Sequence, residues 1–480
     1  MQFMNNQSYN TLIEGCRTNG KRTAITRAIR FLSVVLLLGL AFGCTSTLKP
    51  TLSSPNAVSS SLDDSPVEQL DAVNLRVGAE RFPQYLHLLD GKRVGLVVNQ
   101  SARVRTDSLN NTGTNTLTTS DEADTHLLDA LLAQKVDVKA VFSPEHGFRG
   151  NKGAGEKITS SVDVKTGLPI HSLYGKTKKP TPEMLENIDV LVFDIQDVGV
   201  RFYTYLSTLH YVIEAAFEHN IDVVVLDRPN PNGQHVDGPI LESAFSSFVG
   251  MHPIPVLHGM TLGELAKMMV GENWVTYPTA TTSQLTVVPI SHYMRGSHYR
   301  RTMHYSLPVA PSPNLPNDVA IALYPTLCFF EGTDVSVGRG TDLPFQLIGH
   351  PSVVLGKNKI TVKANAAAPY PKHEDQVLLS AVFETHDALT KVSTESGINV
   401  QLLINTYQAF QQAKNDKSTS SLFFTRPEFF DKLAGTNTLR EMIKIGKSAE
   451  EIKQSWAADL QKFKAQRRPY LLYPDVENSK

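Results

Sequence analysis

Acidic side chains follow three apolar runs of the sequence, at the positions where buried strands would end. Glu145 and His146 follow the run VKAVFSP, Asp194 and Asp197 close the run VLVFDIQD, and Asp227 ends DVVVLD. A carboxylic acid opposed by a carboxylate is the equipment that most glycosidases use to cleave a glycosidic bond. The residue types therefore favour hydrolysis of a sugar linkage.

Amide and arginine side chains occur at the same strand ends. Asn99 follows the run RVGLVV, Arg149 and Arg201 follow the second and third ends within a few residues, and Arg228 and Asn230 follow the fourth. Ligands of an open parallel sheet bind beyond the carboxyl ends of its strands, so four such ends predict one site. A guanidinium binds a carboxylate through two parallel hydrogen bonds, which suits an anionic substrate.

Glu145 is our first choice for the general acid. If the rings of Phe142 and Phe148 pack over it, burial would raise its pKa and suit it to donate a proton. The second carboxylate is left among Asp194, Asp197 and Asp227. A glutamate that only caps backbone amides, or a carbohydrate-binding module with the same polar edge, would present the same residues.

The composition and the missing motifs exclude several other functions. Forty-six basic and 47 acidic residues create no overall field for nucleic acid. The sequence contains no G-x-S-x-G elbow and no H-E-x-x-H, and its 15 histidines show no paired ligand spacing. The glycines of NKGAGEK and GRGT fit no P-loop or dinucleotide fingerprint. We expect neither a metal nor a cofactor.

Apolar strands alternate with helical patterns from Arg93 onward, which is typical of a parallel sheet covered on both faces. Residues 121–134 have helical spacing, and Thr261 with Glu264 forms a capping box before another helix. The pattern predicts an α/β fold with a Rossmann-like catalytic domain over 74–292 and a smaller mixed α/β auxiliary domain over 293–480.

The amino end predicts export. A basic stretch precedes the apolar run FLSVVLLLGLAFG, as in a signal peptide, and the run ends at Gly43-Cys44. Residues 1–44 thus predict a lipoprotein signal with Cys44 lipidated, facing the periplasm or the cell surface. The Ser- and Pro-rich residues 45–73 would be a disordered tether. The alternative is a plain signal peptide with an incidental cysteine.

A set of motifs resembles the NamZ-like exo-β-N-acetylmuramidases, a family long catalogued as a domain of unknown function. The motifs include GLVVNQSA, FSPEHGFRG, VFDIQDVGVRFYTY, LDRPNPNG, PSPNLP and FEGTDVSVGRGT, in order between about Lys92 and Pro474. The resemblance implies a Rossmann-like domain followed by an auxiliary domain. It also implies an exported glycosidase that releases N-acetylmuramic acid from the non-reducing end of peptidoglycan fragments during wall recycling.

The resemblance also implies roles for particular residues. The family's catalytic candidate falls on Glu145, with Asp194 and Asp197 competing for the second role unless the substrate's own acetamido group attacks. Four arginines compete for the lactyl carboxylate of muramic acid. The residues expected to bind the muramic acid glycan or disaccharide are Asn99, His146, Arg149, Arg201, Tyr203, Asp227, Arg228, Asn230, Asn314, Glu331 and Arg339.

Two other functions would fit the same residues. A non-catalytic lipoprotein that binds peptidoglycan fragments would tolerate Gln in place of Glu145. A metal- or phosphate-dependent hydrolase on the same scaffold would be sensitive to chelators. We favour the glycosidase because the motif match is long and because acids outnumber aromatics at the predicted edge.

Overall fold

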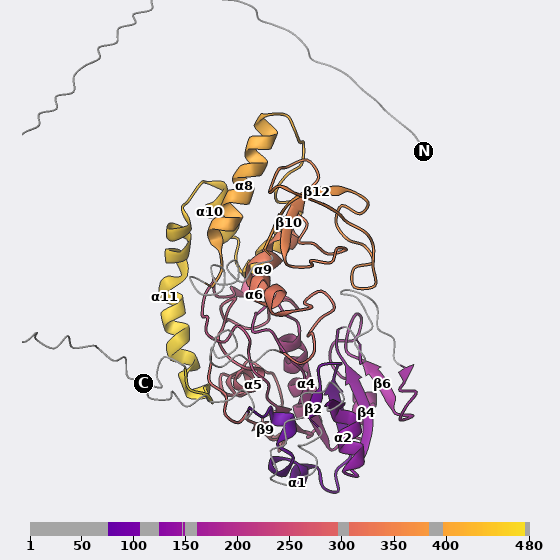
Figure 1. Ribbon diagram of the computed structural model, residues 1–480. Helices are drawn as coiled ribbons and strands as arrows, with labels where there is room; N and C mark the ends of the chain where they lie inside the picture. The colour runs from indigo at the N-terminus through magenta and orange to yellow at the C-terminus, as the bar shows by residue number, and fades with distance from the viewer. Residues whose placement is uncertain are drawn as a thin grey trace, which may run out of the picture. The chain divides into compact units, whose positions relative to one another are not determined.

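Figure 1 shows the chain as a computed structural model that describes residues 75–105, 124–145, 147–148, 161–295, 307–383 and 397–475. These residues belong to one compact unit, Pro66–Lys480. The expected signal peptide, Cys44 and tether lie outside the described residues, as do His146 and Arg149. Within the described ranges, no helix has the length and apolar character needed to cross a membrane.

A seven-stranded sheet forms the first half of the unit, in the order β5-β6-β4-β1-β7-β8-β9. All neighbours from β6 to β9 pair in parallel, and β5 adds an antiparallel edge. The central strands are buried on both faces, which is why they read as continuous apolar runs. The strands are β1 (Val94–Val98), β4 (Val138–Ser143), β5 (Ser161–Val162), β6 (Pro169–Ser172), β7 (Val190–Asp194), β8 (Asp222–Leu226) and β9 (Leu285–Val288).

Helices cover both faces of this sheet. Leu191 and Phe193 of β7 point into a core shared with α4 and α5, and Val190 and Val192 point into a second core shared with α1 and α2. This alternation confirms the predicted α/β layering. The helices are α1 (Leu86–Leu89), α2 (Leu127–Ala133), α3 (Pro182–Leu185), α4 (Tyr205–Glu218) and α5 (Leu262–Gly271), with short 3-10 turns η2 (Gly78–Glu80), η3 (Phe82–Gln84) and η6 (Ser243–Phe245).

Two local predictions have different outcomes. The capping box of α5 is confirmed, because Thr261 Oγ1 accepts from the Glu264 amide and Glu264 Oε2 accepts from the Thr261 amide. The helix expected over 121–134 was wrong at its start: Asp124–His126 is strand β3, paired antiparallel with β2 (Arg103–Arg105). Pairing with a distant strand overrides the local helical pattern.

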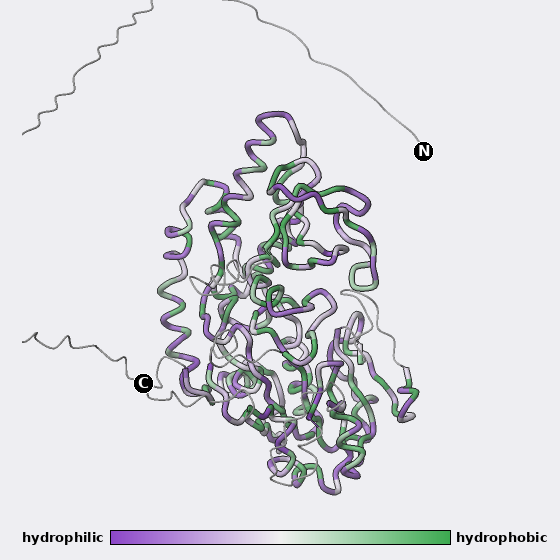
Figure 2. The backbone as a smooth tube through the Cα atoms, viewed as in Figure 1, coloured by the Kyte–Doolittle hydropathy of each residue, from purple (hydrophilic) through white to green (hydrophobic). Residues whose placement is uncertain are grey.

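The second half combines a small sheet with helices. Its three antiparallel strands lie in the order β10-β12-β11. Figure 2 shows hydrophobic positions along α8 and α11 between hydrophilic ones, and buried residues of these helices join the core of α4 and α5. The elements are α6 (Asp318–Leu327), η7 (Cys328–Gly332), β10 (Leu347–His350), β11 (Asn358–Thr361), β12 (Val377–Val382), α8 (Val400–Asn415), α9 (Pro427–Ala434), α10 (Thr438–Lys444), α11 (Ala449–Arg467) and η8 (Arg468–Tyr470). A domain division at 292–293 stays a prediction.

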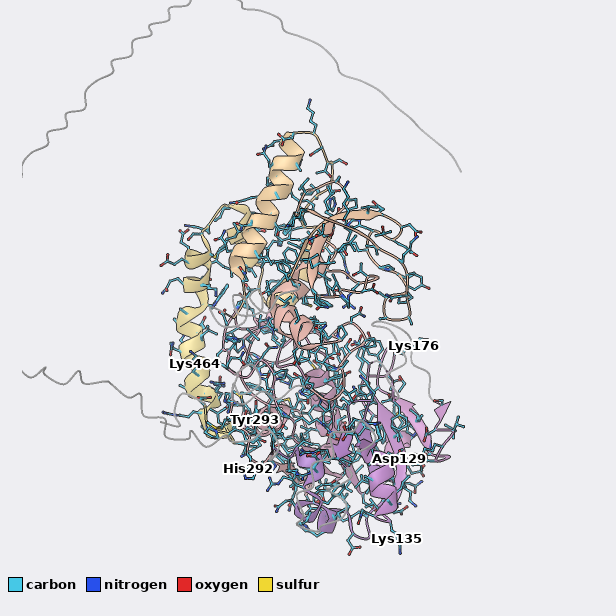
Figure 3. The ribbon with its side chains drawn as sticks, in the orientation of Figure 1. Asp129, Lys135, Lys176, His292, Tyr293 and Lys464 are labelled. Carbon is cyan, nitrogen blue, oxygen red and sulfur yellow. The ribbon has the colours of Figure 1, made fainter. Side chains whose placement is uncertain are left out.

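The carboxyl-terminal segment returns to the large sheet and is fixed there by buried polar contacts. The Tyr473 hydroxyl donates to Asp227 Oδ2 at 2.6 Å, and Tyr293, labelled in Figure 3, packs edge-on against the Tyr473 ring. Arg295 donates to both carboxylate oxygens of Glu264 and to the Tyr473 carbonyl. These bonds connect the last described residues to the first half.

Removing the Tyr473 hydroxyl should therefore destabilise the whole unit. Burial raises the pKa of Asp227 to about 6. Tyr473→Phe deletes the hydrogen bond from the Tyr473 hydroxyl to Asp227 Oδ2, which stabilises the charged form of Asp227. We expect a loss of about 1–3 kcal/mol in the free energy of unfolding, measured by urea denaturation near neutral pH. The control is Tyr470→Phe, whose hydroxyl donates to the partly exposed Glu272. Equal losses in the two variants would contradict this account.

Candidate active site

The parallel sheet brings three of the predicted strand ends together. β4, β1 and β7 are direct neighbours, so Glu145, Asn99 and Asp197, which follow them, lie at the same edge. Polar side chains at the carboxyl ends of adjacent parallel strands are the usual place for a ligand in such folds. The site is therefore built around these three ends.

Two tyrosines at the start of α4 form a polar shelf at this edge. The rings of Tyr203 and Tyr205 meet edge-to-face at 4.9 Å, and their hydroxyls donate to the Pro311 carbonyl at 2.9 and 3.3 Å. Asn99 Nδ2 donates to the Tyr205 hydroxyl at 2.8 Å. Burial raises the pKa of both tyrosines, and the nearby charges of Glu145 and Asp197 raise it further. Glu145 and Asp197 follow the two strands that flank β1, whose end carries Asn99.

Glu145 is half-buried beside this shelf. Its Oε2 accepts a hydrogen bond from Thr204 Oγ1 at 2.9 Å, and Thr204 is the residue between the two tyrosines. A side chain held in one rotamer by a short hydrogen bond is suited to directional proton transfer. The rings of Phe142 and Phe148 belong to the two separate cores, one on each face of the sheet.

Asp197 is the deeper carboxyl of the site. Its Oδ1 accepts from the Gly199 amide at 2.6 Å, whereas its buried Oδ2 has no hydrogen-bond partner among the described residues. Burial raises the pKa of Asp197 to about 7. Gly199 makes this turn possible, because its φ is +76° and a Cβ there would lie 1.8 Å from Asn230 Oδ1.

Unsatisfied polar atoms gather at the same edge. In the part of the chain that the structure describes, four buried atoms at the ends of β1, β4 and β7 have no hydrogen-bond partner. Buried polar groups almost always have a partner, so such a group of atoms points to a polar ligand or to ordered water. The atoms are Gln100 Oε1, Ser143 Oγ, Gln196 Oε1 and Asp197 Oδ2.

Asp194, the other candidate for the second carboxylate, is paired inside the fold. Its side chain is fully buried, and Arg228 donates to both of its oxygens at 2.5 and 2.9 Å. Burial raises the pKa of Asp194, and the bidentate contact with Arg228 opposes that shift. Neither the carboxylate nor the guanidinium has an exposed group with which to contact a substrate.

Three further predicted substrate ligands also have internal partners. Arg201 is 1% exposed and donates to the carbonyls of Pro239, Ile254 and Leu433. Asp227 accepts from Thr261, Gly263 and Tyr473, and Asn230 donates to the Met260 carbonyl. These side chains hold the loops of the edge in place. Their expected contact with substrate finds no support in this arrangement.

The predicted substrate ligands in the second half of the chain are Asn314, Glu331 and Arg339, and they differ in exposure. Asn314 is buried and donates from Nδ2 to the Ala367 carbonyl at 2.7 Å. Glu331 and Arg339 form a partly exposed ion pair of 2.6 Å, and the Arg339 guanidinium lies 4.8 Å above the Phe345 ring. Among Arg201, Arg228 and Arg339, only Arg339 is partly exposed, with 23% of its side chain accessible.

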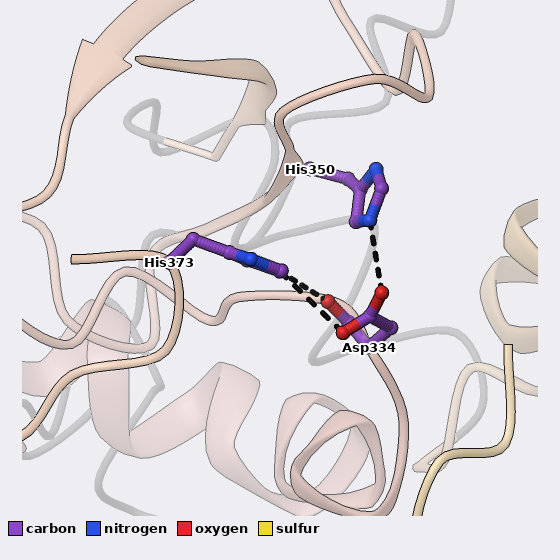
Figure 4. A group of neighbouring side chains, drawn as sticks. All are labelled: Asp334, His350 and His373. Atoms are coloured by element: carbon purple, nitrogen blue, oxygen red, sulfur yellow. Dashed lines mark hydrogen bonds and ion pairs between the residues drawn. The ribbon is translucent and has the colours of Figure 1, made fainter. Parts of the chain in front are cut away.

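A histidine–aspartate cluster in the second half has metal-ligating residue types, as Figure 4 shows. His350 Nδ1 accepts from the amides of Ser352 and Val353, so its Nε2 carries the proton and donates to Asp334 Oδ2 at 3.1 Å. A nitrogen that carries a proton cannot ligate a metal. The pattern indicates a structural hydrogen-bond cluster, with His373 donating to the Asp334 carbonyl.

The sequence did not reveal three contributors to the site. Thr204 and Tyr205 stand in the quoted motif FYTY beside Tyr203, but no spacing rule shows that they would contact Glu145 and Asn99. Gln196 precedes Asp197 and donates to its carbonyl and to that of Pro229. Gln196 lies just after the end of β7, which was its only signal, and Thr204 and Tyr205 gave none beyond their place in the motif.

The raised pKa of Asp197 has a measurable consequence for stability. The folded chain holds this proton up to about pH 7, whereas an unfolded aspartate loses it near pH 4. The unfolded state binds fewer protons in that window, so the free energy of unfolding should fall as pH rises, by up to roughly 4 kcal/mol. Asp197→Asn should flatten this slope in urea denaturation across the window, and the exposed Asp90→Asn should not. An unchanged slope in Asp197→Asn would show that the carboxyl titrates normally.

Comparisons with known proteins identify the family of the chain. The profile described as "Exo-beta-N-acetylmuramidase NamZ, N-terminal" matches residues 94–319, and the corresponding C-terminal profile matches 322–473. The peptidoglycan beta-N-acetylmuramidase NamZ of Bacillus subtilis (strain 168) is 40% identical over 407 residues, which cover 82% of this chain and 89% of that relative.

Two crystal structures show the same fold. Both are DUF1343 family proteins of Bacteroides fragilis, with TM-scores of 0.68 at 41% identity and 0.65 at 29% identity. Each match covers 84% of this chain and 99% of the solved chain. The resemblance first drawn from the motifs is confirmed over both halves, and the chain belongs to the NamZ family of exo-β-N-acetylmuramidases.

Proposed function

We propose that this chain is an exo-acting β-N-acetylmuramidase that releases N-acetylmuramic acid from the non-reducing end of peptidoglycan fragments. The observation that carries the proposal is the pair of carboxyl groups at one edge of the sheet: Glu145 follows β4 and accepts from Thr204 between the two tyrosines of the shelf, and Asp197 follows β7. Two carboxyl groups on one site are what glycoside hydrolysis requires. Membership of the NamZ family indicates that the sugar released is N-acetylmuramic acid.

In this proposal Glu145 protonates the departing glycosidic oxygen as the bond to the anomeric carbon breaks. Thr204 holds its Oε2, which fixes the direction in which the carboxyl faces the substrate. Glu145 also has the exposure that the role needs, because it is half-buried whereas Asp194 is fully enclosed. After departure of the leaving group, the same carboxylate can accept a proton from the incoming water.

Asp197 provides the second carboxyl group. It keeps one buried oxygen without a partner among the described residues, whereas both oxygens of Asp194 are bound to Arg228. Asp197 attacks the anomeric carbon as the nucleophile, or it orients the acetamido group of the substrate. In the second case the acetamido oxygen attacks the anomeric carbon. Both routes need this carboxyl group next to the shelf, and its substitution would stop either of them.

Arg339 is our candidate for the lactyl carboxylate of muramic acid. Its Nε donates to Glu331 Oε1, and its two Nη groups have no hydrogen-bond partner among the described residues. A partly exposed guanidinium with unpaired Nη groups can bind a carboxylate through two parallel hydrogen bonds. His146 and Arg149 follow Glu145 in the sequence, and they remain proposed ligands whose positions lie outside the described residues.

We also propose that the protein is exported and anchored to a membrane through lipidated Cys44. The basic stretch, the apolar run and the Gly43-Cys44 pair support this proposal, and residues 45–73 would then separate the catalytic unit from the membrane. Such a position places the enzyme next to peptidoglycan fragments in the periplasm or at the cell surface.

The activity is tested with chromogenic β-N-acetylmuramide and β-N-acetylglucosaminide substrates. Soluble protein lacking residues 1–45 should release chromophore only from the muramide. Glu145→Gln should lower kcat/KM by about 100-fold or more, the usual contribution of a general acid. The exposed Glu186→Gln serves as control and should match the wild type.

The outcomes separate an enzyme from a binding protein. Thermal unfolding must show that Glu145→Gln is folded. Equal release by wild type and Glu145→Gln would remove Glu145 from catalysis. Absence of release by the wild type, with muramic acid still bound in a calorimetric titration, would make the protein a non-catalytic receptor for peptidoglycan fragments.

A further inference from the structure

The connection between β11 and β12, residues 362–376, is fixed to its surroundings at several points. The Lys372 ammonium donates to the carbonyls of Phe330, Thr333 and Val335, and burial lowers its pKa to about 8. His373 Nε2 donates to the Asp334 carbonyl at 2.6 Å. A buried lysine that caps three carbonyls is costly to displace, so this end of the connection is held firmly.

The middle of the connection is held by the segment next to the candidate site. Asn314 Nδ2 donates to the Ala367 carbonyl at 2.7 Å, and Asn365 and Ala368 exchange two backbone hydrogen bonds of 3.1 Å. Asn314 lies three residues after Pro311, whose carbonyl accepts from Tyr203 and Tyr205. A chain of hydrogen bonds thus connects the tyrosine shelf to this loop.

Tyr370 lies on this anchored loop with 93% of its surface exposed. It stands between Pro369 and Pro371, which restrict the backbone on both sides. A tyrosine side chain usually buries most of its ring, and a large ring held in solvent by a fixed backbone is typical of a binding surface. Little conformational entropy remains to be lost when a ligand packs against it.

A groove lined by both apolar and polar residues lies next to the same loop. Its volume is about 450 Å³, and a Cβ on Gly340, one of its lining residues, would lie 2.8 Å from Pro371, the neighbour of Tyr370. Arg339, our candidate for the lactyl carboxylate, directly precedes Gly340. Asp342, Lys363 and Asn365 contribute polar side chains to the groove, and Lys363 also pairs with Asp375. The lining residues are Gly340, Thr341, Asp342, Leu343, Ile360, Thr361, Lys363 and Asn365.

We propose that Tyr370 and this groove form a second saccharide-binding site, which holds the glycan on the leaving-group side of the scissile bond. The inference rests on the proposed function. An exo-acting enzyme holds the terminal sugar in its catalytic centre, so a sugar-binding surface outside that centre would contact the leaving glycan. An exposed aromatic ring beside hydroxyl and amide groups suits a sugar, whose ring has apolar faces and polar edges.

The first test compares substrates that differ only in the leaving group. Tyr370→Ala should lower the ratio of kcat/KM on a peptide-free muramic acid–glucosamine disaccharide to kcat/KM on the chromogenic muramide. We expect about a tenfold fall, which corresponds to about 1.4 kcal/mol. Tyr370→Trp should restore the ratio because it keeps an aromatic face. Val354→Ala, 71% exposed in the same half, is the control and should leave the ratio at the wild-type value.

The second test measures binding without hydrolysis. In a Glu145→Gln background, Tyr370→Ala should raise the Kd for the peptide-free disaccharide about tenfold in a calorimetric titration. An unchanged Kd and ratio would overturn the inference. A loss confined to fragments that carry a peptide stem would overturn it too, because the loop would then bind peptide. Failure of the wild type to hydrolyse the muramide would contradict the proposed function alone, since this binding measurement stands without turnover.

Discussion

The carbonyl oxygen of Pro311 accepts hydrogen bonds from two tyrosine hydroxyls, and the geometry of the site depends on this contact. Tyr203 and Tyr205 come from the end of the β7 loop, whereas Pro311 comes from the segment that leads into the second half. Gln100, at the end of β1, donates to the same carbonyl at 3.2 Å. Three groups of the sheet edge therefore hold the linking segment over the carboxyl groups. Through Asn314 the same segment positions the loop of Tyr370.

The buried charges around this contact divide into paired and unpaired groups. Asp194 and Arg228 neutralise each other. Arg201 donates to backbone carbonyls through both Nη groups, but its buried Nε has no hydrogen-bond partner among the described residues. Asp197 has no counter-ion among the described residues, and burial raises its pKa to about 7. A fold tolerates an unpaired buried carboxyl group at a cost to stability, and catalytic sites are where that cost commonly serves a function.

Much of the fold follows from local patterns, and much of the site does not. Continuous apolar runs predicted the strands of the sheet, and the capping box of Thr261 and Glu264 predicted the start of a helix that covers it. Both signals depend only on neighbours in the sequence. The direction in which a side chain points depends on tertiary partners. Arg201 and Arg339 were both predicted to bind substrate, but only the contacts of Arg201 with distant carbonyls show that it faces inward. The Asp334 cluster was missed for the same reason, since its histidines lie 16 and 39 residues away in the chain.

The most direct test of the account concerns which carboxyl group protonates the leaving oxygen. It would measure kcat/KM for aryl β-N-acetylmuramides whose phenols differ widely in acidity, with the wild type, Glu145→Gln and Asp197→Asn. A general acid matters most for a poor leaving group. The account predicts that Glu145→Gln stays close to wild type on the most acidic phenol and loses about 100-fold or more on the least acidic one, whereas Asp197→Asn loses activity on all. An equal loss across the series in Glu145→Gln would contradict its role as the general acid.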